Sequence, residues 1–250
     1  MTRADGGTHT DLVRLASEFA DNITTRVHSV VMTEKSLSAL LLPDRNGSSR
    51  IMVGIVEGDN FGTFPLRIGG RHRLDLLIKF NCCLDSTGRH LATDASWFHV
   101  TAKGDKAPLF RYEYVRPFQQ GVPSAHLHVH GHRDEFAFAM QVGDRGRPKA
   151  RKRRHEVPRL AKFHFPLGGH RFRPCVEDAL QAVVEEFCVE TNDGWQDAIA
   201  EGREQWRQLQ LLSAVRDAPA IAAKALEDLE YKVVPPTSAP ALNASRLRAY

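Results

Sequence analysis

The 250-residue chain contains no run of apolar residues that approaches the ~20 needed to cross a bilayer. Its first residues lack the basic segment and the apolar stretch of a secretory signal. It has only four cysteines and no Cys-x-x-Cys pair, and Cys82 and Cys83 are adjacent. A disulfide framework needs cysteines that are more numerous and better spaced, so we expect reduced thiols in a cytoplasmic protein that does not contact a membrane.

Sequence patterns of several enzyme classes are missing as well. There is no Walker pattern and no nucleophile elbow, and Gly168-Gly169 lacks the surroundings of a phosphate-binding loop. Hydrophobic residues nevertheless make up 42% of the chain and charged residues 26%. These proportions allow a buried core and exclude disorder of the whole chain.

Basic residues are concentrated in one stretch of the chain. In total, 34 Lys and Arg stand against 30 Asp and Glu, which gives a formal net charge of +4. Seven basic residues and no acidic ones lie within 145–154: Arg145, Arg147, Lys149, Arg151, Lys152, Arg153 and Arg154. Without them the chain would be slightly acidic. We expect a mobile loop over 141–157 that binds the phosphate backbone of a nucleic acid, with a merely solvated loop as the alternative.

Hydrophobic periodicity predicts an α+β fold. Apolar residues follow helical spacing over 10–31 and again after Pro174, which is expected at the first position of a closing helix. Between these helices, apolar and polar residues alternate in strand-like segments, of which the clearest are 74–82, 91–102, 109–115 and 125–132. We expect a meandering antiparallel sheet of about 4–6 strands, with an N-terminal helix, a closing helix and a C-terminal helical extension.

The chain is expected to divide into four parts. They are an N-terminal helical segment (1–45), an α+β core domain (46–190), a C-terminal helical extension (191–234) and a disordered tail (235–250). The tail is rich in Pro, Ala and Ser, a composition that buries little apolar surface.

The 12 histidines are unevenly distributed, and seven of them fall between His126 and His170. His126, His128, His130 and His132 alternate with other residues, so a strand would place all four imidazoles on one face. Alternate residues lie ~6.6 Å apart along a strand, which lets two imidazoles share a divalent metal ion or a phosphate. No cofactor is required by the sequence patterns, but a divalent metal could bind at this face. The alternative is a solvent-facing side of an edge strand.

Arg111 and Glu113 share one face of the preceding strand, and pairing of the two strands would bring them beside the histidines. A carboxylate, an imidazole and a guanidinium suffice for metal-independent cleavage of RNA. Either Glu113 or one of His126, His128 and His130 would exchange the protons. Arg111 would stabilise the charge of the phosphorane. An ordinary Arg–Glu ion pair is the alternative.

Two further arginines, Arg171 and Arg173, precede the closing helix. The N-terminus of a helix attracts anions, so these side chains are candidates for binding the phosphates of a nucleic acid. Ion pairs with Glu177 or Asp178 are the alternative.

The order of these features resembles the TumE-type toxins of bacterial toxin–antitoxin pairs. The matching pieces are Arg111-Tyr112-Glu113, His126–His132 and the helix opening Pro174-Cys175-Val176-Glu177-Asp178-Ala179-Leu180, within about 66–187. The resemblance implies a small α+β protein that acts on RNA and has an antitoxin protein as its partner. This chain lacks the Asp-Asn that follows the aromatic residue in the family, and it adds the basic stretch and a C-terminal extension. The string Gly168–Pro174 also resembles uncharacterised actinobacterial proteins, for which no activity is implied.

Two other functions remain open. His126-Leu127-His128-Val129-His130 is similar to the histidine triad of nucleotide hydrolases and transferases, which would make His128 the nucleophile, although Gly131-His132 replaces the apolar pair that follows the triad. A non-enzymatic protein that binds nucleic acid or another partner is the third possibility. We predict a phosphodiester-acting, toxin-like endoribonuclease, and the sequence leaves its oligomeric state open.

Overall fold

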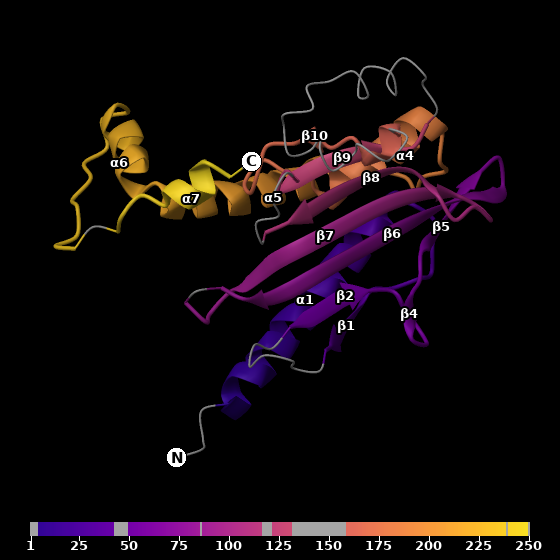
Figure 1. Cartoon of the computed structure of the whole chain (residues 1–250), viewed down its shortest axis with the longest axis horizontal. Helices are drawn as coiled ribbons and strands as arrows, with labels where there is room; N and C mark the ends of the chain where they lie inside the picture. The colour runs from indigo at the N-terminus through magenta and orange to yellow at the C-terminus, as the bar shows by residue number, and fades with distance from the viewer. Residues whose placement is uncertain are drawn as a thin grey trace.

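The computed structural model describes residues 5–42, 50–85, 87–116, 122–131, 159–238 and 240–249. It confirms the α+β class, because an antiparallel sheet is covered on one face by helices (Figure 1). Within the described residues this sheet has eight strands, more than predicted, in the order β1-β2-β6-β7-β8-β9-β10 with β5 paired to β6. Its strands are β1 (Ser38–Leu41), β2 (Ile51–Gly54), β5 (Phe64–Ile68), β6 (Arg71–Leu84), β7 (Leu91–Ala102), β8 (Pro108–Val115), β9 (Ala125–Val129) and β10 (Phe165–Pro166).

Helices and short elements complete the described structure. The helices are α1 (Asp5–Val30), α4 (Val176–Phe187), α5 (Trp195–Asp217), α6 (Pro219–Glu227) and α7 (Ala244–Leu247). A short hairpin joins β3 (Val56–Glu57) to β4 (Asn60–Phe61), and the 3₁₀ turn η1 (Leu160–Lys162) precedes β10. None of the helices in the described ranges is both long enough and apolar enough to cross a membrane.

Strand β6 follows the predicted alternation. Leu74, Leu76, Ile78 and Phe80 are buried, whereas the residues between them are partly exposed. Full burial of an aliphatic or aromatic side chain contributes about 1.5–3 kcal/mol, so one face of the sheet is strongly driven into the core.

Helices α1 and α4 cover this apolar face. Ala16, Ile23 and Val27 recur at helical spacing along α1 and are at most 6% exposed. Leu180 and Val183 of α4 join the same core, which continues into the apolar side chains of β6 and β7. The opposite face of the sheet is therefore the one on which polar side chains can gather.

Helix α4 begins two residues later than predicted. Pro174 was expected at its first position, but Cys175 is extended and serves as the N-cap. The Cys175 N–H donates to Asp178 Oδ2 at 3.0 Å, a bond that requires the chain to turn into the helix only after Cys175.

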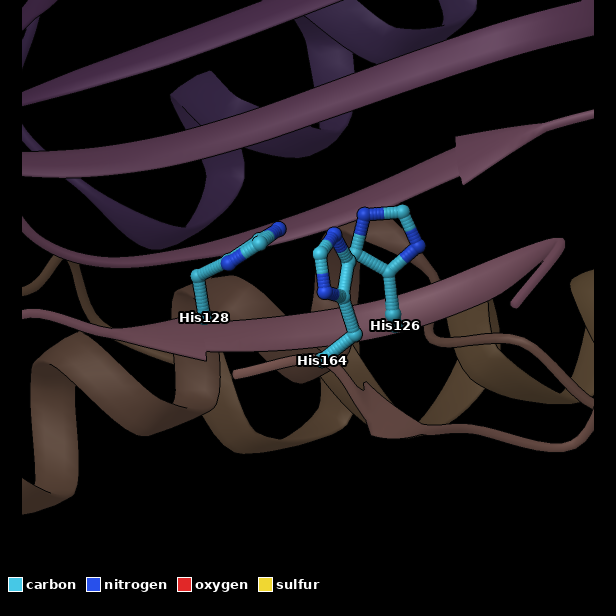
Figure 2. A group of neighbouring side chains, drawn as sticks. All are labelled: His126, His128 and His164. Atoms are coloured by element: carbon cyan, nitrogen blue, oxygen red, sulfur yellow. The ribbon is translucent and has the colours of Figure 1, made fainter. Parts of the chain in front are cut away.

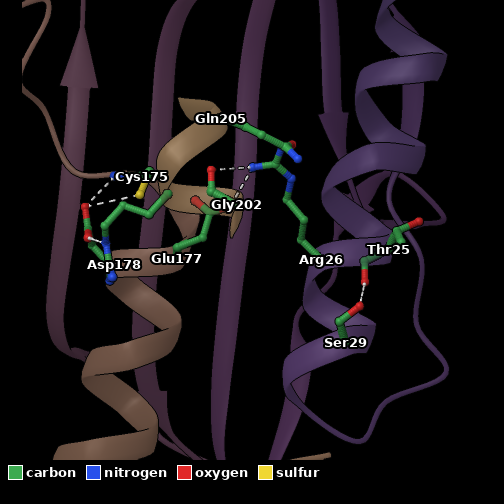
Figure 3. Close-up of polar contacts among 9 residues, drawn as sticks. Thr25, Arg26, Ser29, Cys175, Glu177, Asp178, Gly202 and Gln205 are labelled. Carbon is green, nitrogen blue, oxygen red and sulfur yellow. Dashed lines mark hydrogen bonds and ion pairs between the residues drawn. The ribbon is translucent and has the colours of Figure 1, made fainter. Parts of the chain in front are cut away.

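An ion pair ties α1 to α4 and α5. Arg26 Nη1 lies 2.5 Å from Glu177 Oε1, and the same guanidinium donates to Gly202 O and Gln205 Oε1 (Figure 3). The contact lies among three helices and away from the polar face of the sheet.

The C-terminal part runs beyond the sheet, and α6 projects away from it (Figure 1). Helix α7 lies within 235–250, where we predicted disorder, and the Asn243 N–H donates to Asp217 O at 2.8 Å. Part of the predicted tail therefore has regular structure attached to the end of α5.

Two other sequence predictions concern the cysteines and the basic loop. All four cysteines carry free thiols, as their spacing predicted. His132 and the predicted basic loop over 141–157, with all seven of its basic residues, lie outside the described residues.

Candidate functional site

The register of three strands places polar residues side by side on the face opposite α1 and α4. Glu113 of β8 pairs with His126 of β9, and Arg111 pairs with His128. On the other side of β8, Arg111 pairs with His99 of β7. Directly paired residues of antiparallel strands point to the same face, so the structure brings these predicted residues together.

The Glu113 carboxylate is the centre of this group. Its Oε1 lies 3.0 Å from His99 Nε2 and 3.3 Å from Arg111 Nε. Its Oε2 lies 3.3 Å from His126 Nε2 and 3.8 Å from His128 Nε2. We call Arg111, Glu113, His99, His126, His128 and His164 the Glu113 cluster.

These contacts decide the ionisation of Glu113. Burial by itself would raise its pKa, but hydrogen bonds from His126 and His99 and the charge of Arg111 outweigh burial. The pKa of Glu113 is therefore held well below its usual range, and the side chain is a carboxylate at neutral pH.

The two β9 imidazoles are fixed from behind by backbone carbonyls. His126 Nδ1 lies 2.8 Å from Pro123 O, and His128 Nδ1 lies 2.8 Å from Ala161 O. A carbonyl only accepts, so both Nδ1 atoms carry hydrogen and both Nε2 atoms face Glu113. Burial, followed by the charge of Arg111, lowers the pKa of His128 to about 4. His128 is therefore neutral at pH 7, with a lone pair on Nε2.

His164 completes the group of imidazoles (Figure 2). Phe165 pairs with Leu127, which sets His164 beside His128 on the polar face. The His164 ring centroid lies 4.9 Å from that of His126 and 4.4 Å from that of His128. One nitrogen of each of the three rings lies within 4.8 Å of the other two. His164 was not among the predicted site residues, although its position between Phe163 and Phe165 repeats the alternation seen in β9.

His130 lies at the edge of the cluster. Burial, Arg111 and His99 lower its pKa, which places it near those two side chains. Within the described residues, His130 Nε2 is buried without a hydrogen-bond partner. Arg111 Nε makes no hydrogen bond of good geometry there either, but it is ion-paired with Glu113 Oε1 at 3.3 Å.

Lys79 and Trp97 extend the row of Glu113 and His126 across the sheet. Lys79 pairs with Trp97, and Trp97 pairs with Glu113. The Lys79 Nζ lies 4.5 Å from the centre of the Trp97 ring. Burial lowers the pKa of Lys79, with Glu113 acting in the opposite direction.

Arg171 and Arg173 are not part of this cluster. Arg171 Nε lies 2.7 Å from Asp217 Oδ2. Arg173 donates to His170 O, and its guanidinium lies 4.0 Å from the Tyr114 ring, which alternation places on the face opposite Glu113. Both side chains are engaged in internal contacts, and neither forms the ion pairs with Glu177 or Asp178 that were the alternative.

Comparisons of the chain with protein-family models, with curated proteins and with solved structures found no match. The chemistry and geometry of the Glu113 cluster are therefore the basis on which a function is inferred.

Proposed function

We propose that the Glu113 cluster cleaves phosphodiester bonds of RNA. The observation that carries this proposal is that two neighbouring imidazoles, His126 and His128, direct their Nε2 atoms at the same oxygen, Glu113 Oε2. The rings lie 4.9 Å apart, beside the guanidinium of Arg111.

His126 is suited to donate a proton. Its two nitrogens face Pro123 O and Glu113 Oε2, which both accept, so the ring makes both contacts only when both nitrogens carry hydrogen. His128 presents an Nε2 lone pair and is suited to accept a proton. Such pairs of groups with contrasting environments are typical of acid–base catalysis.

In the proposed reaction, His128 Nε2 takes the proton of the ribose 2′-hydroxyl. The 2′-oxygen forms a bond to phosphorus, the bond from phosphorus to the 5′-oxygen breaks, and His126 protonates that oxygen. The products are a 2′,3′-cyclic phosphate and a 5′-hydroxyl. Arg111 stabilises the charge on the phosphorane, and Glu113 stays ionised and orients His126.

The test is cleavage of a mixed-sequence RNA oligonucleotide by chelator-treated protein, with DNA of the same sequence alongside. We expect cleavage of the RNA only, with cyclic phosphate ends. His128→Ala should lower the rate at least about 100-fold, because general acid–base groups contribute 10²–10⁴-fold. His72→Ala is the matched control, because His72 lies outside the cluster, with its Nε2 atom 2.9 Å from Asp75 Oδ1. If the wild-type protein leaves the RNA uncut, or if His128→Ala keeps full activity, the proposal is refuted.

The same protein separates the other functions. Cleavage of dinucleoside polyphosphates that is lost in His128→Ala would favour the histidine-triad chemistry. Intact RNA with salt-sensitive binding, lost on deletion of 145–154, would favour a binding protein. The antitoxin partner implied by the resemblance stays a prediction, which co-purification with the product of a neighbouring gene would test.

A further inference from the structure

We propose that His126, His128 and His164 form a binding site for one divalent transition-metal ion, of which Zn²⁺ is the natural probe. The site goes beyond the proposed function, because it requires only the three imidazoles and no RNA.

The spacing of the ring nitrogens is close to that of metal ligands. One nitrogen of each ring lies within 4.8 Å of the other two. Zinc binds imidazole nitrogen at about 2.0–2.1 Å, which puts two ligands of a tetrahedral ion about 3.3 Å apart. To reach that spacing from 4.8 Å, each nitrogen has to move by only about 1 Å towards the other two.

A backbone carbonyl behind each β9 imidazole orients the ring for metal binding. Histidines that bind metals commonly donate their other ring N–H to a carbonyl or carboxylate, which fixes the tautomer and the direction of the lone pair. His126 and His128 do so to Pro123 O and Ala161 O, both at 2.8 Å. Both are 2% exposed, so their Nε2 atoms are already withdrawn from water.

A carboxylate, that of Glu113, lies beside the imidazoles. Glu113 Oε2 lies 3.3 Å from His126 Nε2 and 3.8 Å from His128 Nε2. Arg111 and His99 contact the other oxygen, which leaves Oε2 directed at the imidazoles. Glu113 is thus placed to act as a fourth ligand or to balance the charge of the ion.

The donor set also selects the metal. Imidazole nitrogens suit Zn²⁺, Co²⁺ and Ni²⁺, whereas Mg²⁺ and Ca²⁺ require a shell made mainly of oxygen. Among the described residues, the group that meets the distance requirement contains three histidines and no carboxylate. We therefore expect the site to discriminate strongly against Mg²⁺.

One consequence rests on the proposed function. A bound ion occupies the Nε2 lone pair of His128 and takes the place of the hydrogen on His126 Nε2. These are the atoms proposed to move protons, so metal binding and RNA cleavage by this route exclude each other. A loaded protein should be inactive, and a chelator should restore cleavage.

The binding test uses the full chain, purified without a histidine tag and dialysed against chelator. We expect one equivalent of Co²⁺ to give the visible absorption of a tetrahedral site, and Zn²⁺ to displace it with micromolar or tighter affinity. Mg²⁺ should do neither. His164→Ala and His128→Asn should each weaken Zn²⁺ binding at least about 100-fold, whereas His72→Ala should not change it.

Folding of each variant is checked by circular dichroism. Two cluster variants are used so that the test still works if one of them does not fold. Absence of stoichiometric binding, or binding that survives in both folded variants, would overturn the site. A site that binds zinc in a protein that leaves RNA intact would support the metal inference and refute the proposed function. Cleavage that requires the ion would overturn the predicted exclusion while leaving the site in place.

Discussion

Glu113 and Glu177 are both carboxylates withdrawn from water, but their partners differ. The Glu177 side chain is 3% exposed and lies 2.5 Å from a single guanidinium, that of Arg26. The Glu113 side chain is 15% exposed and is surrounded by imidazoles and by Arg111, which contacts one of its oxygens. The first carboxylate lies among helices and the second on the polar face of the sheet.

This difference distinguishes a charge that stabilises the fold from one that is available for chemistry. The positive charge beside Glu177 is permanent, because a guanidinium does not lose its proton in proteins. Most partners of Glu113 are imidazoles, whose charge depends on a proton that an incoming group or an ion can replace. Glu177 therefore serves the fold, whereas Glu113 has exchangeable partners.

The largest effect on stability should come from removing the fixed charge. Arg26→Met leaves Glu177 buried without a counter-charge, which costs about 3 kcal/mol of the free energy of unfolding. Arg111→Met should cost at most about 1 kcal/mol, because His99 and His126 still contact Glu113. Urea unfolding of both variants measures the difference. Equal losses of unfolding free energy in the two variants would show that the two carboxylates are stabilised alike.

Conservative changes at the two carboxylates should have opposite consequences. Glu113→Gln keeps the shape of the side chain but removes the charge that orients His126, so RNA cleavage should fall about 100-fold, equivalent to about 2.7 kcal/mol. Glu177→Gln should lower stability and leave the cleavage rate of the folded protein unchanged. Rates and unfolding curves of both variants would separate the two roles. If Glu177→Gln is fully folded and still loses activity, the assignment of these two roles is wrong.

The sequence predicted one of these environments better than the other. Strand alternation has a period of two, so it placed Arg111, Glu113, His126 and His128 on one face before any pairing was known. Consecutive strands of a meander then pair as neighbours, which brought the two segments together. The prediction for β8 and β9 needed only local information.

Long-range contacts escaped the prediction for a physical reason. Arg26 and Glu177 are 151 residues apart, and their meeting depends on how two helices cross, which periodicity does not specify. From the sequence, Glu177 or Asp178 was accordingly matched only with Arg171 and Arg173, as the alternative to phosphate binding by these arginines. His164 was missed because β10 joins β9 across residues that carry no strand pattern.

A close approach in the helical region gives the next largest effect. A methyl group at Gly202 would overlap the Glu177 carboxylate, which Arg26 holds in place. Gly202→Ala should therefore cost about 1–2 kcal/mol, although alanine normally favours a helix by about 1 kcal/mol relative to glycine. In a Glu177→Ala background the same change should become neutral or stabilising. An additive double-mutant cycle would show that the two sites do not interact.

The smallest effect concerns His170, a buried histidine that contrasts with His128. Burial, then Arg246, Arg171 and Arg173, lower its pKa to about 4, while the Tyr114 hydroxyl lies 3.1 Å from His170 Nδ1. An unfolded histidine has a pKa near 6.5. Between about pH 6.5 and 4 the unfolded chain therefore binds a proton at this histidine that the folded chain does not bind. Stability falls as the pH decreases through this window.

His170→Asn tests this assignment, because its amide oxygen can accept the Tyr114 hydroxyl but does not titrate. The free energy of unfolding should fall by about 1 kcal/mol less between pH 7 and pH 5.5 in the variant than in the wild type. The contrast with His128 is chemical, because the His170 nitrogen that faces the interior is already occupied by Tyr114, whereas that of His128 faces Glu113 and His164. Parallel pH profiles would mean that His170 takes up a proton as readily in the folded chain as in the unfolded one.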